Sequence, residues 1–202
     1  EVARENGLEI DEAGFVAAAE VHSKISGSAV GEYQSRAFGN QETEFVGYDQ
    51  TDCEAKIAAF SGSQVVLDRT PFYAESGGQV GDEGELIGEN FRARVLDTQK
   101  QGKAWVHEIE ILEGEISDGQ SVRAVVDMPR RQAIQRAHSA THLLHAALRK
   151  HLGKHVEQRG SLVEGDRLRF DFVHFAPITN EELERIEDIV NAEILTSLPV
   201  EI

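Results

Sequence analysis

The chain of 202 residues is 40% hydrophobic, 28% charged and 6% aromatic, which is enough for one full domain and a smaller companion. Apolar residues recur along its whole length, so a largely disordered chain is excluded, and no run of about 18 apolar residues predicts a membrane span. A formal net charge of −16 argues against a general nucleic-acid binder, because such proteins bind by neutralising phosphates.

The first part of the chain is predicted to contain a helix followed by a β-rich domain. Asp11 can cap a helix whose apolar positions run from Phe15 to Ile25, and polar residues from 26 to 40 indicate a linker. Short apolar runs then alternate with turns that contain Gly or Asp, and they predict strands at Glu44–Tyr48, Gln64–Leu67, Phe91–Leu96, Trp105–Ile109 and Ser121–Val126. Strands at this spacing are typical of a small antiparallel barrel, so we expect residues 1–40 to precede a barrel-like domain over residues 41–127.

After residue 127 the apolar pattern takes the period of a helix. Asp127 is the predicted N-cap, and Pro129 suits the first turn, where a missing N–H costs nothing. An apolar stripe follows at three- and four-residue steps, formed by Ile134, Ala137, Thr141, Leu144 and Leu148. We expect Gly153 to end this helix in the left-handed conformation.

Two strands and a second helix follow, and residues 128–202 are predicted to be the first part of a second domain. The strands are Gly160–Val163 and Arg167–Phe172, joined by a turn at residues 164–166. Thr179 and Glu182 form a capping-box signature for the helix, whose predicted inner face is Leu183, Ile186, Ile189, Val190 and Ile194. The predicted fold class is therefore α+β, a small β-barrel-like domain followed by a helix packed on an antiparallel sheet.

His138 and His142 are candidate metal ligands. They are four residues apart in a predicted helix, so both imidazoles leave the same side, as two ligands of one metal ion would. Ser139 stands where a zinc protease has its catalytic glutamate, which argues against that class. Zinc needs three or four protein ligands, and Cys53 and His174 are candidates for the others. The alternative is a polar helix edge with hydrogen-bonded histidines.

Three further positions carry candidate chemistry, each with a plainer interpretation. Gly77-Gly78 allows the backbone to approach a ligand closely, although a glycine-rich turn between strands has the same pattern. The hydroxyl of Thr141 lies close to any metal that the histidines bind, or simply bonds a preceding carbonyl. Gln158 can both donate and accept hydrogen bonds, but read alone it is a surface residue.

Taken together, these motifs resemble the editing region of the alanyl-tRNA synthetase family. The matching segments are residues 70–79 (TPFYAESGGQ), 136–149 (RAHSATHLLHAALR), 155–161 (HVEQRGS) and 167–172 (RLRFDF). Residues 5–15 (ENGLEIDEAGF) are similar to the segment that precedes this region in the whole synthetase. A more distant form of the same core occurs in threonyl-tRNA synthetase, and the resemblance therefore implies a fold of the threonyl/alanyl-tRNA synthetase type.

The resemblance implies hydrolysis of tRNA(Ala) mischarged with serine or glycine, in an enzyme whose aminoacylation domain uses ATP and Mg²⁺ to attach alanine. It implies that a second zinc-ligand pair, Cys-x-x-x-His, lies beyond Ile202. Without that pair the isolated chain would bind Zn²⁺ weakly. The implied site residues are His138 and His142 as zinc ligands, Thr141 and Gln158 in the catalytic pocket, and Gly77, Gly78 and Gln79 in substrate recognition.

Two other functions remain open on the sequence. One is a free-standing trans-editing deacylase, and the other is a non-catalytic tRNA-binding module. The second is motivated by residues 123–169, where ten Lys and Arg side chains outnumber four Asp and Glu and five of the eight histidines occur. A single cysteine, Cys53, and a charged N-terminus without a secretory signal predict a cytoplasmic protein. The only methionine is Met128, so we expect the chain to be a piece of a longer protein.

Overall fold

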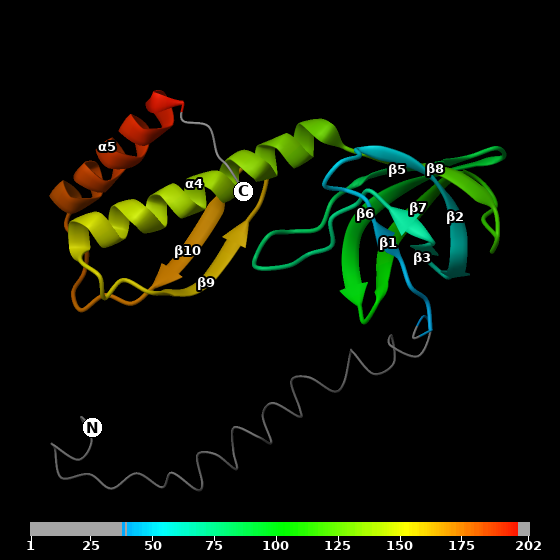
Figure 1. The fold of residues 1–202 in the computed structure, drawn as a ribbon, viewed down its shortest axis with the longest axis horizontal. Coiled ribbons are helices and arrows are strands. Elements are labelled where there is room, and N and C mark those ends of the chain that lie inside the picture. The colour runs from blue at the N-terminus through cyan, green and yellow to red at the C-terminus, as the bar shows by residue number, and fades with distance from the viewer. Residues whose placement is uncertain (1–37, 39, 198–202) are drawn as a thin grey trace, which may run out of the picture.

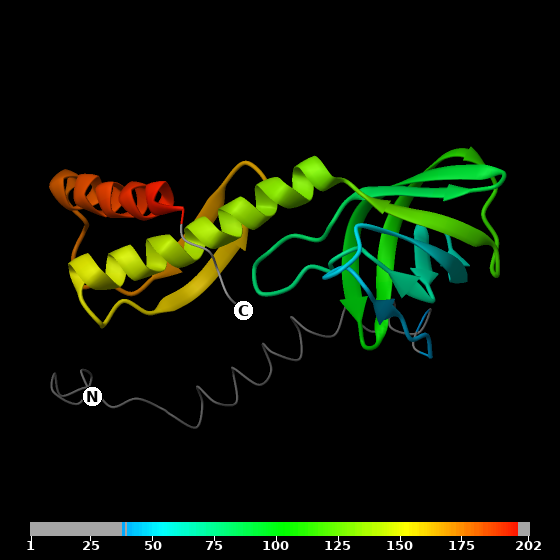
Figure 2. The ribbon, with the colours of Figure 1, turned by 45° about the horizontal axis from the view of Figure 1, so that its top comes forward.

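The computed structural model describes residue 38 and residues 40–197, which form a β-barrel and a helix–hairpin layer (Figure 1). The long helix α4 leads from the barrel into the second part and lies beside α5 and the β9–β10 hairpin (Figure 2). The predicted helix that starts at Asp11 and nearly all of the linker fall outside the described residues. The architecture is α+β, as the sequence predicts.

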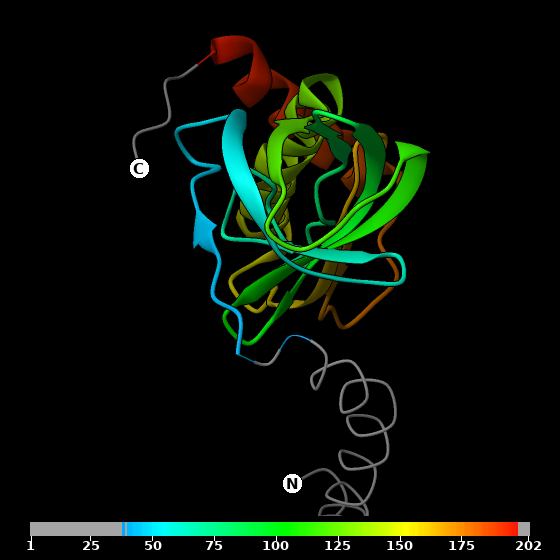
Figure 3. The same cartoon turned by 90° about the vertical axis from the view of Figure 1, so that its right-hand side faces the viewer.

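Six strands close the barrel in the order β2-β3-β7-β6-β5-β8, with every neighbouring pair antiparallel (Figure 3). Their bounds are Asp52–Ser61 for β2, Gln64–Leu67 for β3, Gly84–Gly88 for β5, Phe91–Gln101 for β6, Ala104–Gly114 for β7 and Ser121–Val126 for β8. Alternate side chains of each strand point inward and fill the interior, including Ile57, Leu67, Leu86, Val95 and Val122. Because the barrel is closed, none of these six strands forms a free sheet edge.

The predicted strands need three corrections. Only Glu44–Phe45 of the first predicted strand is β-structure, and this short β1 pairs in parallel with β4 (Arg69–Thr70) outside the barrel. The sequence prediction missed β2, because its inward positions begin with the small side chains of Cys53 and Ala55. It also missed β5, which has glycine at both ends. A Cβ on Gly84 would lie 2.1 Å from the Val125 carbonyl oxygen, so only glycine fits there.

Helix α4 (Met128–Leu152) begins as predicted. The Asp127 side chain accepts a hydrogen bond from the backbone N–H of Arg130 at 3.0 Å, and proline occupies the first turn. The predicted stripe faces inward, with its most buried members at Ile134, Thr141 and Leu148. Gly153 ends the helix with a positive φ of 119°, as the predicted left-handed conformation requires, but its ψ of 167° lies outside the αL range.

The second part of the fold packs α4 against α5 (Asn180–Thr196) and against the hairpin of β9 (Gln158–Val163) and β10 (Leu168–Phe172). The predicted capping box at Thr179 is present. The shared core includes Leu148, Val156, Phe170, Ile186 and Ile189. Leu183 and Ile194 were predicted on the inner face of α5 but are 49% and 52% exposed, so that assignment is wrong. Among the described residues, no helix combines the length and apolar character needed to cross a membrane.

Candidate functional site

The glycine motif lies on a loop that leaves the barrel between β4 and β5 and reaches the second part of the fold (Figure 1). Ser76 and Gln79 exchange both backbone hydrogen bonds, at 3.0 and 3.1 Å, and so close a tight turn over the two glycines. Gly77 and Gly78 both have positive φ, of 61° and 85°, as a type I′ turn requires. The plainer interpretation, a glycine turn, is therefore confirmed, but the turn does not join two barrel strands.

The tip of this loop is held against β9. The carbonyl oxygen of Gly78 accepts a hydrogen bond from the N–H of Val163 at 2.8 Å, and the N–H of Val80 donates to the Val163 carbonyl at 3.2 Å. A Cβ on Gly78 would lie 2.4 Å from the carbonyl oxygen of Ser161, a distance that no side chain tolerates. Close backbone approach is thus real at Gly78, and it is made to β9.

The loop also contacts His138, the first member of the histidine pair of α4. The Oε1 atom of Gln79 lies 2.6 Å from Nδ1 of His138. The rings of His138 and His142 are stacked, with centroids 5.1 Å apart and planes 13° apart, so both leave the same side of the helix as predicted. Burial lowers the pKa of His138, and the positive charge that His142 can carry lowers it further. At neutral pH this favours the neutral imidazole, the form that binds a metal or a proton.

Thr141 and Gln158 take different positions relative to the loop. The hydroxyl of Thr141 is buried and donates to the carbonyl oxygen of Ala137 at 2.9 Å, as the plainer interpretation predicted. Its oxygen can still accept a hydrogen bond. Gln158 is exposed, but its Nε2 donates to the Ser161 hydroxyl at 3.1 Å, and that hydroxyl donates to the Gly77 carbonyl at 3.3 Å. A polar chain therefore links Gln158 to the glycine turn.

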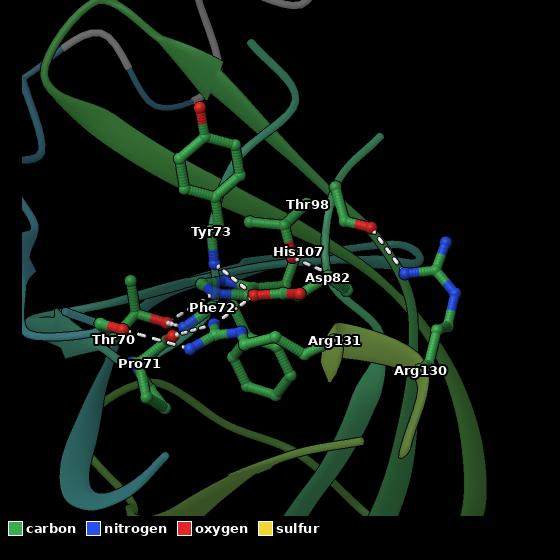
Figure 4. Close-up of polar contacts among 11 residues, drawn as sticks. Thr70, Pro71, Phe72, Tyr73, Asp82, Thr98, His107, Arg130 and Arg131 are labelled. Atoms are coloured by element: carbon green, nitrogen blue, oxygen red, sulfur yellow. Dashed lines mark hydrogen bonds and ion pairs between the residues drawn. The ribbon is translucent and has the colours of Figure 1, made fainter. Parts of the chain in front are cut away.

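A buried ion pair fixes the base of the loop to the first turn of α4. The Arg131 guanidinium contacts the Asp82 carboxylate and donates to the carbonyl oxygens of Pro71 at 2.6 Å and Gly47 at 3.0 Å (Figure 4). Asp82 also accepts the backbone N–H of Tyr73 at 2.7 Å. The pair is almost fully shielded, with side-chain exposures of 9% for Arg131 and 1% for Asp82. These contacts hold both ends of the loop.

The sequence prediction missed Arg131, Asp82 and Ser161 as positioning residues. Arg131 was counted with the positive charge of residues 123–169, and only its place one turn from a helix start distinguishes it in the sequence. Six of the ten basic side chains in that range form ion pairs with neighbouring carboxylates: Arg123, Arg130, Arg131, Arg159, Arg167 and Arg169. Much of the positive charge is therefore already neutralised within the fold.

The candidate metal donors fit zinc only in part. His138 is oriented by Gln79 through Nδ1, which leaves its Nε2 free, and this is the arrangement that metal-binding histidines usually have. Cys53 lies buried in the barrel interior, where burial raises the pKa of its thiol, so its prediction as a donor is wrong. His174 instead lies 2.9 Å from His155, beyond the end of α4. Within the described ranges no group of three or more His, Cys, Asp or Glu is placed to hold a metal ion.

A large cavity of about 720 Å³ lies elsewhere on α4 and takes in none of the predicted site residues. Its lining comes from α4, from the β9–β10 turn and from Ile194 of α5. The candidate site is therefore the contact of the glycine turn with α4 and β9, not this cavity.

The family model of class II (A) tRNA synthetases matches residues 1–130. The chain belongs to this family. It is 45% identical over 226 aligned residues to the alanine–tRNA ligase of Acetivibrio thermocellus, which covers 100% of the chain and 26% of that ligase. It is 44% identical over 210 aligned residues to the alanine–tRNA ligase of Legionella pneumophila (strain Lens), which covers 96% of the chain and 24% of that ligase.

The chain thus spans about a quarter of the length of the curated relatives it matches. The family match ends at Arg130, at the start of α4. The alignment with the Acetivibrio ligase covers the whole chain and so includes the histidine pair. Both parts of this class II synthetase chain therefore have counterparts in one ligase.

Proposed function

We propose that the chain is part of an alanine–tRNA ligase and contributes a site that hydrolyses tRNA(Ala) mischarged with serine or glycine. The observation that carries this proposal is the contact of Gln79 with His138 at 2.6 Å, because it joins the glycine motif to the histidine motif. These two motifs are far apart in the sequence, and each alone has a plainer explanation. Similarity to alanine–tRNA ligases over 96–100% of the chain supports the ligase over a free-standing deacylase.

Hydrolysis of the ester requires the protein mainly to position a water molecule and the substrate. An aminoacyl ester is already labile, so the site must hold a water molecule near the ester carbonyl and stabilise the oxyanion that forms. Because its pKa is lowered, His138 favours the neutral imidazole at pH 7, and its Nε2 is then available as a ligand to a metal ion. Gln158, ordered through Ser161 against the glycine turn, can hydrogen-bond the amino acid or the ribose.

Serine is distinguished from alanine by one hydroxyl group. The Thr141 oxygen, whose own proton is bonded to Ala137, is left as an acceptor for that hydroxyl. A site that bonds a hydroxyl rejects the analogue that lacks it by a factor of about 10⁴, because its polar group would then stay unpaired. We therefore assign serine selection to Thr141.

Zinc, with His138 and His142 as two of its ligands, would supply Lewis acidity to the same site. Its remaining ligands would come from parts of the ligase outside the described residues. The role of this chain is then to orient the first pair, which Gln79 does for His138.

The test is hydrolysis of Ser-tRNA(Ala) and Gly-tRNA(Ala), with Ala-tRNA(Ala) as control, by the complete ligase and by this chain. Serine and glycine should be released while alanine is spared. In the ligase, His138→Ala and His142→Ala should each abolish release and reduce bound zinc. His151→Ala is the matched control, since His151 is an exposed histidine on the same helix. Retained zinc and retained hydrolysis in the His138 variant would contradict the assignment.

A non-catalytic tRNA-binding module is the remaining alternative. It would bind tRNA without cleaving any of the three esters. The ion pairs that neutralise much of residues 123–169 count against it, because phosphate binding needs free positive charge.

A further inference from the structure

The barrel carries an aromatic pocket beside the glycine loop, on a surface that the proposed hydrolysis does not use. The pocket has a volume of about 450 Å³ and is lined by Phe45, Tyr48, Tyr73, Lys100 and Trp105, with Ser76 at its edge. Ser76 is also the first residue of the glycine turn. The pocket and the candidate site therefore adjoin the same turn, since Ser76 lines the pocket and its hydrogen-bond partner Gln79 contacts His138.

The rings of the pocket are arranged around a fixed stack. Phe45 lies parallel to Trp105, with centroids 5.8 Å and planes 8° apart, and the Lys100 ammonium lies 4.4 Å from the Trp105 centroid. Tyr48 and Tyr73 meet Phe45 edge to face at 5.0 and 6.2 Å. In Figure 4 the Tyr73 ring points away from Asp82, while its backbone N–H is held by that carboxylate. The ion pair at the loop base thus also places a wall of the pocket.

Tyr48 is the aromatic residue of this cluster whose ring is most open to solvent. Its side chain is 85% exposed, so packing inside the barrel does not account for a large aromatic residue there. An exposed ring beside a rigid aromatic stack is the usual platform for a stacked base. A pocket of this volume is in the range that holds a small ligand group such as one nucleotide.

The charged side chains around the pocket favour a ligand with a phosphate over an organic cation. An aromatic cage can hold an organic cation, but here Lys100 already lies over the Trp105 ring and would repel one. The same ammonium attracts a phosphate next to a stacked base. The Glu75 carboxylate on the rim is engaged by Nε2 of Gln99 at 2.7 Å. A flat, uncharged ring with an attached phosphate fits these groups.

We propose that this pocket binds one unpaired nucleotide of the single-stranded 3′ end of tRNA. This inference rests on the proposed function, because the ester to be hydrolysed is attached to that end. With the terminal ribose at the histidine pair, the strand continues along the loop toward Ser76, and a neighbouring base stacks on Tyr48. Lys100 then pairs with the phosphate of that nucleotide.

Trp105 is the only tryptophan of the chain, so its fluorescence reports on the pocket directly. The probe is a seven-nucleotide RNA that ends in CCA and carries no amino acid. It is titrated at low salt, with the anisotropy of the labelled RNA as a second readout. Saturable binding is expected, and annealing the RNA to its complement should abolish it. AMP alone should bind at least tenfold more weakly, and equal binding of AMP would overturn the RNA assignment in favour of a free mononucleotide.

The variants separate stacking from charge. Tyr48→Ala should raise the Kd of the RNA by about 5- to 150-fold, the range for loss of one stacked base, and Tyr48→Phe should restore it. Lys100→Gln should lower the slope of log Kd against log salt by about 0.7, as expected for one phosphate contact on a single strand. Phe175→Ala is the matched control, since Phe175 is 82% exposed and lies in the second part of the fold. A Tyr48→Ala variant no weaker than Phe175→Ala would overturn the inference.

Failure of this inference can be told apart from failure of the proposed function. If wild-type ligase hydrolyses Ser-tRNA(Ala) and Tyr48→Ala leaves both KM and RNA binding unchanged, the pocket assignment is wrong and the function stands. If the RNA binds through Tyr48 but no ester is cleaved, the pocket stands and the hydrolytic proposal is wrong. If both hold, Tyr48→Ala raises KM while kcat is kept.

Discussion

Replacing Arg131 with methionine should destabilise the chain far more than any other arginine change on α4. Methionine has similar length but leaves the Asp82 carboxylate buried without its partner and deprives the Pro71 and Gly47 carbonyls of a donor. Removing one partner of a buried ion pair costs about 3–5 kcal/mol, whereas an exposed pair is worth about 0–1 kcal/mol. The side-chain exposures of 9% and 1% place this pair in the first class.

Urea unfolding followed by circular dichroism and by Trp105 fluorescence measures this loss in both parts of the fold. Arg136→Met is the matched control, because Arg136 is exposed on the same helix and should change stability by less than about 0.5 kcal/mol. The Asp82→Asn and Arg131→Met double variant should cost about 1–3 kcal/mol less than the sum of the two single changes. A loss below about 1 kcal/mol for Arg131→Met, or simple additivity, would refute the reasoning.

Three further predictions concern the barrel, the loop and α5. Burial lowers the pKa of His107 from 6.5 to about 4. Only the unfolded chain then takes up this proton between those values, so about 3 kcal/mol of stability present above pH 6.5 is lost as the pH falls to 4. His107→Gln should remove that part of the pH dependence of urea unfolding, and a profile parallel to wild type would contradict this. Gly78→Ala should release the loop and speed amide exchange at Val163, while Gly77→Ala, with nothing within 4 Å of its Cβ, should add only about 1 kcal/mol of backbone strain and leave exchange unchanged. Thr179→Ala should cost about 1 kcal/mol by removing the N-cap of α5, measured by thermal unfolding, and Thr179→Ser should cost nothing.

The parts of the fold that the sequence predicted are those in which local pattern and burial agree. The stripe of α4, its cap at Asp127 and the capping box at Thr179 are local features, and all three are present. Strands β2 and β5 were missed because the barrel uses cysteine, alanine and glycine where strands approach closely, and these residues carry weak strand signals. The outer positions of α5 were misassigned because an apolar period cannot tell which side meets the rest of the protein.

In the candidate site too, the sequence predicted the local features but not the contacts between residues far apart in the chain. The common direction of His138 and His142 follows from helix geometry, so sequence spacing was enough. The contacts of Gln79 with His138 and of Asp82 with Arg131 join residues 59 and 49 positions apart, and no local rule pairs such residues. For Cys53 the sequence suggested a role that the fold does not allow. Its thiol is a suitable metal ligand, but its position in β2 directs it into the barrel core.

The contacts of the loop between β4 and β5 explain why residues 71–83 contain so many residues with specific structural roles. Its base needs Asp82 to hold Arg131, its tip needs Gly78 to touch β9, and Gln79 must then reach His138. Each requirement depends on the one before, because a displaced base moves the tip and the tip carries Gln79. Arg131→Met should therefore reduce hydrolysis as well as stability, even though Arg131 touches none of the proposed site residues on α4 or β9.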